Sequence, residues 1–174
     1  TAVSTNGINF SWNMDNSITV DSANFSHTFN QHGTHTVNLT ATSAEGCIGN
    51  STMNVEVFPL PQPEFSSNPV CLNGTTDFDN ASQIATGTIS TFNWFFGDGQ
   101  STVSNDPNHL YTSAGTFQAS LIATSNNGCI ATVAHPVTVY ANPAVNFSTG
   151  VQGCSPVLAT PRDLTVSTDG QITG

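Results

Sequence analysis

The segment FNWFFGDGQS, Phe92–Ser101, places Asp98 between Gly97 and Gly99, directly after a run of aromatic residues. A glycine-rich loop can bind a phosphate when a helix N-terminus follows it, usually with a lysine. No lysine occurs in the chain and no helical period follows the loop. Asp-Gly between strand-forming residues instead favours a tight turn, because both residues tolerate positive φ. We therefore expect Gly97, Asp98 and Gly99 to form a structural turn.

The acidic residues offer a second chemistry, which is calcium binding by carboxylate oxygens. Their nearest cluster is DFDN, Asp77–Asn80, which lacks the Asp-x-Asp-x-Asp spacing of a calcium loop. Carboxylates on one face of a short strand are more typical of a solvated surface, although calcium binding stays an open alternative. No Gly-x-Ser-x-Gly or His-Glu-x-x-His motif occurs. The sequence therefore predicts no catalytic residue, no metal ligand and no cofactor.

The composition restricts the partners and the cellular setting of the protein. Arg162 is the single basic residue against eleven acidic ones, and the formal net charge is −10. Nucleic acids and anionic membrane surfaces need cationic patches, so we expect neither as a partner. No apolar run approaches the roughly 20 residues that span a bilayer, and we expect no membrane insertion. Four cysteines without a Cys-x-x-Cys pair favour disulfides and an extracellular setting.

The elements that carry these residues occur twice. Shifting the chain by 82 positions aligns Phe10 with Phe92 and Trp12 with Trp94, and it aligns two copies of Gly-Cys-Ile. Residues 10–65 and their counterparts share seventeen identities in 56 ungapped positions. Because chance matching at this composition would give well under half of that number, we interpret the similarity as an internal repeat.

The repeat predicts three domain segments. A partial unit covers residues 1–60, a complete unit covers 61–142, and the start of a third unit covers 143–174. Segments such as TISTFNWFF, GTFQASLIAT and HPVTVY show partial period-2 alternation, and turn residues separate them. About seven short strands per unit predict an all-β fold of tandem immunoglobulin-like sandwiches, one complete and two partial. Because both outer units are incomplete, we interpret the chain as a window on a longer tandem array. Proline-bearing linkers, which are semi-rigid spacers, join the units.

The alignment also bears on the histidines and on catalysis. His27, His32 and His35 lie within nine residues, which would suit a metal site. His27 recurs as His109, whereas the other two align with an alanine and a phenylalanine. We therefore expect them on the surface of a turn and a hairpin. Asp98 and Asp106 align with asparagines, which cannot act as general acids or bases, so catalysis is not expected.

The second unit resembles the PKD domain family, whose hallmark is a Trp-x-Phe-Gly-Asp-Gly strand and turn followed by His-x-Tyr and a Gly-Thr-aromatic strand. The matching residues are Trp94, Phe96, Gly97, Asp98, Gly99, His109, Tyr111, Gly115, Thr116 and Phe117. The first unit departs from the pattern at its turn and has Phe29 in place of tyrosine. CLNG and the late Gly-Cys are similar to repeats of large secreted surface and adhesin proteins of Bacteroidota. The resemblance implies non-catalytic β-sandwiches that serve as spacers and contact modules. We expect Trp12, Trp94 and Tyr111 in their cores.

The cysteines follow the same register. Cys71 opens the second unit and Cys129 closes its long hairpin, so we predict a disulfide between them. It would close a loop of 129 − 71 = 58 residues and contribute about 3–4 kcal/mol in the chain-entropy model. The register places the partner of Cys47 upstream of this sequence and that of Cys154 downstream. We predict that both bond to residues outside the chain.

These observations favour a non-catalytic structural or adhesive segment of a long secreted, cell-surface or filament protein. Its expected partners are like repeats, other surface proteins and glycans. The alternative is an accessory substrate- or glycan-binding module of a secreted hydrolase. The tripeptide Asp21–Ala23 resembles the Asp-Ser/Thr-small motif for O-glycosylation in Bacteroidota, which makes Ser22 a candidate modification site.

Overall fold

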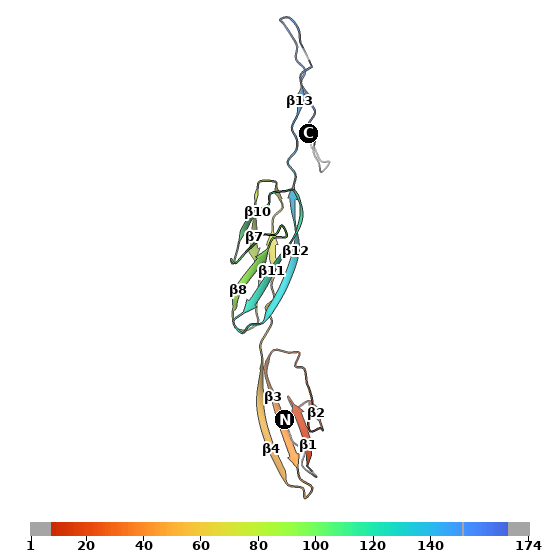
Figure 1. Ribbon diagram of the computed structural model, residues 1–174, viewed down its shortest axis with the longest axis vertical. Coiled ribbons are helices and arrows are strands. Elements are labelled where there is room, and N and C mark those ends of the chain that lie inside the picture. Colours follow the sequence, from red (N-terminus) through yellow and green to blue (C-terminus); the bar gives the residue numbers. More distant parts are fainter. Residues whose placement is uncertain (1–7, 151, 167–174) are drawn as a thin grey trace. The chain divides into compact units, whose positions relative to one another are not determined.

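The computed structural model describes residues 8–150 and 152–166, which form β-strands joined by turns without a helix among them (Figure 1). The outermost residues of the two predicted partial units, 1–7 and 167–174, lie outside the described part. Contacts divide the chain into two compact units, Thr1–Leu60 and Pro61–Gly174. The predicted all-β, immunoglobulin-like fold is confirmed.

Unit 1 contains one antiparallel four-stranded sheet. Its strands are β1 (Asn9–Met14), β2 (Ile18–Val20), β3 (Gly33–Thr42) and β4 (Ile48–Val57). They are arranged in the order β2-β1-β3-β4. The β3–β4 pairing runs without a register shift from Gly33 opposite Val57 to Thr42 opposite Ile48. β3 and β4 are the longest strands of the unit, and the Gly-Cys-Ile segment lies at the turn between them.

Unit 2 contains the two sheets of a sandwich and a small additional hairpin. One sheet has the order β10-β7-β5, the other has the order β6-β12-β11-β8-β9, and the hairpin pairs β13 with β14. In the larger sheet β6 pairs parallel to β12, and the remaining pairs are antiparallel. The strands are β5 (Phe65–Ser67), β6 (Val70–Cys71), β7 (Thr75–Asn80), β8 (Ile89–Phe95), β9 (Ser101–Thr102), β10 (Asn108–Leu110), β11 (Gly115–Ser125), β12 (Ile130–Tyr140), β13 (Phe147–Ser148) and β14 (Arg162–Asp163).

The core of unit 2 lies between its two sheets. Alternate residues of β11 are fully buried because successive side chains of a strand point to opposite faces. Trp94 and Tyr111 are 0% and 1% exposed. The rings of Phe65 and Phe78, which come from the smaller sheet, pack on Trp94 with centroids 5.0 and 5.5 Å apart. The smaller sheet therefore covers the face on which the tryptophan lies.

Unit 1 repeats four of the five strands of the larger sheet without this cover. β1 to β4 correspond to β8, β9, β11 and β12, and the described part of unit 1 has no counterpart of β5, β6, β7 or β10. The indole N–H of Trp12 donates to the Ser22 carbonyl at 2.9 Å, as that of Trp94 does to Ser104 at 3.0 Å. Yet Trp12, which we expected in the core, is only half-buried. Among the described residues, Phe25 packs on Trp12 with ring centroids 5.2 Å apart, but no second sheet supplies a pair of rings like Phe65 and Phe78.

The last described segment begins as unit 2 begins. In unit 2 the chain pairs Phe65 with Asn80 and bridges Gln62 to Gln83. The segment that follows β12 pairs Phe147 with Asp163 and bridges Ala144 to Val166. The first members are shifted by 82 positions and the second by 83, as the single inserted residue before Cys154 requires. The opening hairpin of the complete unit is thus formed a second time along the chain.

The predicted disulfide between Cys71 and Cys129 is wrong. No disulfide joins the four cysteines in the structure. Cys71 lies opposite Tyr140 in the β6–β12 pair, whereas Cys129 precedes the first residue of β12. The eleven residues between these two levels of the strand span roughly 36 Å, and a disulfide needs Cα atoms about 4.4–6.8 Å apart. The two cysteines therefore lie at opposite ends of the unit.

Candidate functional site

The turn that joins β8 to β9 contains the three residues that the sequence analysis selected. Gly97 and Gly99 have backbone φ angles of 85° and 91°, which residues other than glycine rarely adopt. The backbone N–H of Gln100 donates to a carboxylate oxygen of Asp98 at 3.0 Å. The N–H of Phe96 donates to the Gln100 carbonyl, also at 3.0 Å. The chain continues into a strand and not into a helix, so the loop offers no phosphate site.

Asp98 forms an ion pair that connects the two sheets. Its Oδ2 atom lies 2.7 Å from Nε2 of His109, which belongs to β10 of the smaller sheet. The imidazole stacks on Phe96, with ring centroids 4.0 Å apart. Partial burial by itself would raise the pKa of Asp98, but the hydrogen bonds from His109 and the backbone of Gln100 outweigh it and hold that pKa below its usual range. The pair acts as a cross-sheet tie.

Tyr111 extends the same contact into the core. Its hydroxyl donates to the Phe96 carbonyl at 2.9 Å, and its ring stacks on Phe117 with centroids 4.3 Å apart. Burial, together with the nearby charge of Asp98, raises the pKa of Tyr111 to about 12. The phenol therefore remains a neutral hydrogen-bond donor, and the arrangement offers no reactive phenolate.

We expect Tyr111→Phe to lower the free energy of unfolding of unit 2 by about 1–2 kcal/mol, because the buried Phe96 carbonyl loses its donor. Urea denaturation of both proteins measures the difference. Tyr140→Phe is the matched control, since Tyr140 is 45% exposed, and we expect almost no change there. Equal effects of the two substitutions would show that the buried hydrogen bond is not the cause.

Unit 1 has a different ion pair in the corresponding region. Nδ1 of His35 lies 2.6 Å from Oδ2 of Asp15, and its Nε2 lies 2.8 Å from the Gln31 carbonyl. The other carboxylate oxygen of Asp15 accepts the N–H of Thr36 at 2.8 Å. The ring of His35 stacks on Phe29, with centroids 4.4 Å apart. The pair fixes the β1–β2 turn to the start of β3.

This pair was not predicted from the sequence. Asp15 and His35 align with Gly97 and Phe117, so neither stands where unit 2 has a charged residue. One feature of the sequence could have indicated the pair: unit 1 has both an acid and a base at two positions where unit 2 has uncharged residues. The backbone of the turn survives without glycine, because Asp15 has a φ of 48° and aspartate is one of the residues that tolerate this region.

The Asp15–His35 pair predicts a defined pH window. The hydrogen bond from His35 lowers the pKa of Asp15 from 3.8, and the same bond raises the pKa of His35 from 6.5. Because the His35 pKa is raised in the folded state, its stabilisation is complete below 6.5 and is lost as the pH rises through the folded value. Because the Asp15 pKa is lowered in the folded state, the stabilisation from Asp15 is complete above 3.8 and is lost as the pH falls through the folded pKa of Asp15. The pair is therefore effective between the two shifted values.

We expect Asp15→Asn to return the titration midpoint of His35 toward 6.5, as measured by NMR of the imidazole nitrogens across the pH range. Asp21→Asn, which removes an exposed carboxylate from the same unit, should leave the midpoint of His35 in place. A midpoint that is unchanged by Asp15→Asn would refute the pairing.

The remaining candidate groups do not converge on a reactive site. His27 packs edge-on against Phe29, with centroids 4.7 Å apart, and His32 is exposed. Asp106 accepts the N–H of Asn80 at 3.0 Å and does not pair with a histidine. The acidic residues of β7 alternate with buried ones and are exposed. Within residues 8–150 and 152–166, no three histidine, cysteine, aspartate or glutamate side chains are close enough to hold a metal ion.

A family model described as PKD domain matches residues 2–57 and 59–139, which is more than three quarters of the chain. The chain belongs to the PKD domain family. The resemblance inferred from the Trp-x-Phe-Gly-Asp-Gly strand and turn is confirmed. PKD domains are generally non-catalytic modules. No helix in the described part of the chain is long and apolar enough to cross a membrane.

Solved structures of PKD domains cover about half of the chain. The PKD1 domain of Vibrio anguillarum Epp is 26% identical over 48% of this chain and 96% of its own, with a TM-score of 0.45. The PKD1 domain of the Vibrio cholerae metalloprotease PrtV is also 26% identical, over 48% and 98% of the two chains, with a TM-score of 0.41. The fibronectin(III)-like modules of Clostridium thermocellum CbhA match at 14% identity over 81% of this chain and 83% of theirs, with a TM-score of 0.43. A comparison with curated protein sequences gives no significant match.

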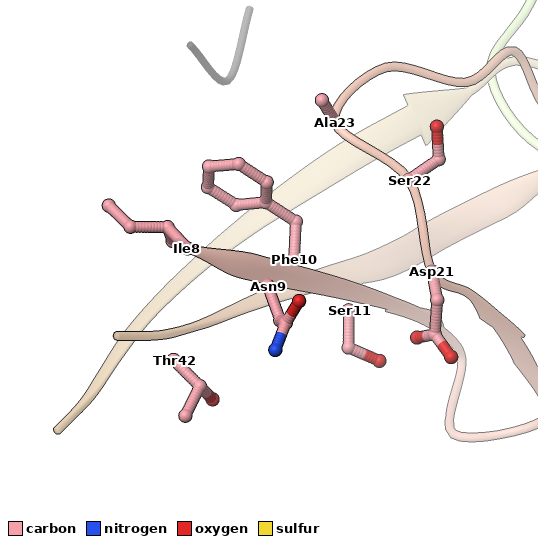
Figure 2. A pocket seen from close by; sticks show the side chains of 8 residues that line it. All are labelled: Ile8, Asn9, Phe10, Ser11, Asp21, Ser22, Ala23 and Thr42. Carbon is pink, nitrogen blue, oxygen red and sulfur yellow. The ribbon is translucent and has the colours of Figure 1, made fainter. Parts of the chain in front are cut away.

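The first PKD unit also contains a cleft of about 650 Å³ beside β1. Figure 2 shows the ring of Phe10 on one side of the strand and the side chains of Asn9 and Ser11 on the other. The lining combines aliphatic and aromatic groups with hydroxyl, amide and carboxylate oxygens, from Ile8, Asn9, Phe10, Ser11, Asp21, Ser22, Ala23 and Thr42. The cleft therefore offers both apolar and polar contacts.

Ser22, the candidate O-glycosylation site, lies at this cleft. Its side chain is exposed, and its hydroxyl donates to the Asn24 carbonyl at 2.8 Å. Its own carbonyl accepts the indole N–H of Trp12. The hydroxyl is therefore accessible on a backbone that the fold holds in place, and its modification stays a prediction.

Proposed function

We propose that this chain is a non-catalytic section of a long extracellular or cell-surface protein, in which PKD units act as a stiff spacer and as contact modules. We divide it into a partial unit at 1–60, a complete unit at 61–142 and the start of a third at 143–174. The observation that carries the proposal is the repeated architecture. Four strands of the larger sheet of the complete unit are formed once before it, and its opening hairpin is formed once after it.

The use of the polar residues supports a structural role. Asp98 pairs directly with His109 of the other sheet, and the hydroxyl of Tyr111 donates to the Phe96 carbonyl. Asp15 and His35 fix a turn in the other unit. These two pairs are in different units and do not share a pocket. Structural ion pairs also shift pKa values, so we interpret both pairs as parts of the fold and not as a reaction centre. We infer that this part of the protein is not an enzyme.

The composition and the linkers support an extended extracellular role. Only 7% of the residues are charged, so the surface presents mainly hydroxyl and amide groups, which suit broad polar contacts with like repeats or other surface proteins. Three prolines lie in the linker between Val57 and Phe65. Because proline restricts the backbone, such a linker is a semi-rigid spacer and not a loose tether.

A series of chains with one, two or three extra copies of residues 61–142, inserted in tandem after residue 142, tests the spacer. Small-angle X-ray scattering would give the maximum dimension of each. We expect equal increments per copy, because stiffly joined units add their lengths. Units joined by flexible tethers would instead expand with roughly the square root of their number, and that result would refute the proposal. A series in which each linker is replaced by glycine and serine shows the flexible limit.

The cleft in unit 1 favours a second candidate function, which is glycan binding by an accessory module. Titration of the chain with cello-, xylo- and chito-oligosaccharides, followed by NMR, would test it. The second function predicts shifts at the cleft that Phe10→Ala abolishes. Phe92→Ala removes the corresponding ring of unit 2, which does not line the cleft, and should leave the shifts in place. No shift with any of the three sugars would remove the support that the cleft gives.

A further inference from the structure

Cys71 is fixed beside the place where the chain leaves the sandwich of unit 2. It pairs with Tyr140, the last residue of β12. The next residue, Leu72, donates its N–H to the Tyr140 carbonyl at 2.8 Å, and its own carbonyl accepts the side-chain amide of Asn142 at 3.1 Å. The outgoing linker is thus bound to the residue next to Cys71. The cysteine itself is exposed.

Cys129 is held at the opposite end, where the chain enters the unit. Its N–H donates to the hydroxyl of Ser125 at 3.1 Å, and its carbonyl accepts the N–H of the same residue at 2.9 Å. Cys47 makes the same two contacts with Ser43, at 3.2 and 2.9 Å. Both units therefore present this cysteine on the same rigid hairpin turn.

The register of β12 gives the level of Cys129 relative to the incoming chain. Val70 lies opposite Val139, and Glu64 contacts His135 at 2.6 Å, so the two segments run alongside each other with an offset of 69 to 71 residues. Cys129 precedes the first residue of β12, so within unit 2 it lies toward the end by which the chain enters, whereas Cys71 lies at the end by which the chain leaves.

We propose that these two cysteines are the halves of a disulfide between consecutive repeats. The cysteine at the place of Cys71 in one repeat bonds to the cysteine at the place of Cys129 in the repeat that follows. Cys47 is then the second half for unit 1, and Cys154 is the first half for the third repeat. This inference rests on the tandem order that the proposed function assumes. It adds a covalent clamp across each linker, because within one unit the first half lies at the end by which the chain leaves and the second half lies at the end by which it enters.

The bond needs an external oxidant, for which we name a disulfide such as oxidised glutathione. One cysteine attacks the oxidant as a thiolate and forms a mixed disulfide, releasing one glutathione thiol. The thiolate of the second cysteine then attacks the protein sulfur and displaces the other glutathione. The two cysteine thiols lose two electrons and two protons in total, and the glutathione disulfide is reduced to two thiols.

A chain with one extra copy of residues 61–142, inserted after residue 142, contains one complementary pair. Cys71 of the first copy and Cys129 of the second copy should bond when the folded monomer is oxidised with glutathione disulfide. Peptide mapping without reduction identifies the link. This longer chain has six cysteines, which are the four of the original chain and two from the added copy. After oxidation and removal of mixed disulfides, labelling with a maleimide should detect four free thiols.

Matched variants assign the bond to its copies. Cys71→Ser in the first copy should abolish the link, whereas Cys71→Ser in the second copy should leave it intact. The original chain, which lacks a complementary pair, should keep four reactive thiols under the same conditions. A link between Cys71 and Cys129 of the same copy, or six free thiols in the oxidised monomer, would overturn the proposal. Neither result would affect the scattering test of the spacer, so the two proposals fail separately.

Discussion

Trp94→Ala is expected to lower the free energy of unfolding of unit 2 by about 3–5 kcal/mol, the range measured when a large buried aromatic side chain is removed. Trp94 is completely buried, and its ring contacts those of Phe65 and Phe78. Its loss leaves a cavity between the sheets and also leaves the Ser104 carbonyl without its indole donor. Because a single domain has a net stability of about 5–15 kcal/mol, this substitution should bring unit 2 close to unfolding at room temperature.

The repeat supplies the control. Trp12→Ala removes the same side chain from the corresponding position of unit 1, where the indole is only half-buried. We expect a clearly smaller loss there, because less apolar surface returns to water and no covered cavity is created. Thermal and urea denaturation, with near-ultraviolet circular dichroism as the probe, would measure both. Equal losses at the two positions would contradict the difference in cover that the structure shows.

Gly97→Ala is expected to destabilise unit 2 by about 2–5 kcal/mol, which is the sum of two contributions. Its φ of 85° costs an L residue about 1–2 kcal/mol. A Cβ atom at this position would also lie 2.6 Å from the carbonyl oxygen and 2.8 Å from the amide nitrogen of Gln118. These are backbone atoms of β11, so the clash can be relieved only by moving a central strand, at an additional cost of about 1–3 kcal/mol.

Gly99→Ala separates the two contributions. Gly99 has a similar φ of 91°, but no atom lies within 4 Å of its Cβ position. We expect only the conformational cost of about 1–2 kcal/mol there. The difference in the free energy of unfolding between the two variants, measured by urea denaturation, gives the cost of the contact with the Gln118 backbone. If Gly97→Ala were no worse than Gly99→Ala, the close packing of the turn on β11 would be disproved.

Unit 2 is folded without a disulfide between Cys71 and Cys129. An internal bridge between Cys71 and Cys129 would have stabilised each unit by itself. The register of β6 and β12 instead places these cysteines at opposite ends of the unit, where they are available to neighbouring repeats. We therefore expect unit 2 to depend on its packed aromatic core and on the Asp98–His109 tie for its own stability.

The sequence by itself determined the fold class, the family and the turn. A shift of 82 positions reveals the repeat because strand positions that face a core must keep similar side chains, as Trp12 and Trp94 or Leu39 and Leu121 do. The turn at Gly97–Gly99 was predictable because positive φ angles restrict the local residue types. Such local constraints are visible in one chain without any knowledge of what packs on what.

The tertiary structure alone decided the ion pairs and the places of the cysteines. Asp15 and His35 are 20 residues apart, and only the pairing of β1 with β3 brings them together. The parallel pairing of β6 with β12 likewise assigns Cys71 to one end of the unit and Cys129 to the other. The burial of Trp94 and the partial exposure of Trp12 depend on whether a second sheet covers them. Sequence spacing cannot give these results, because strand order and register determine which distant residues meet.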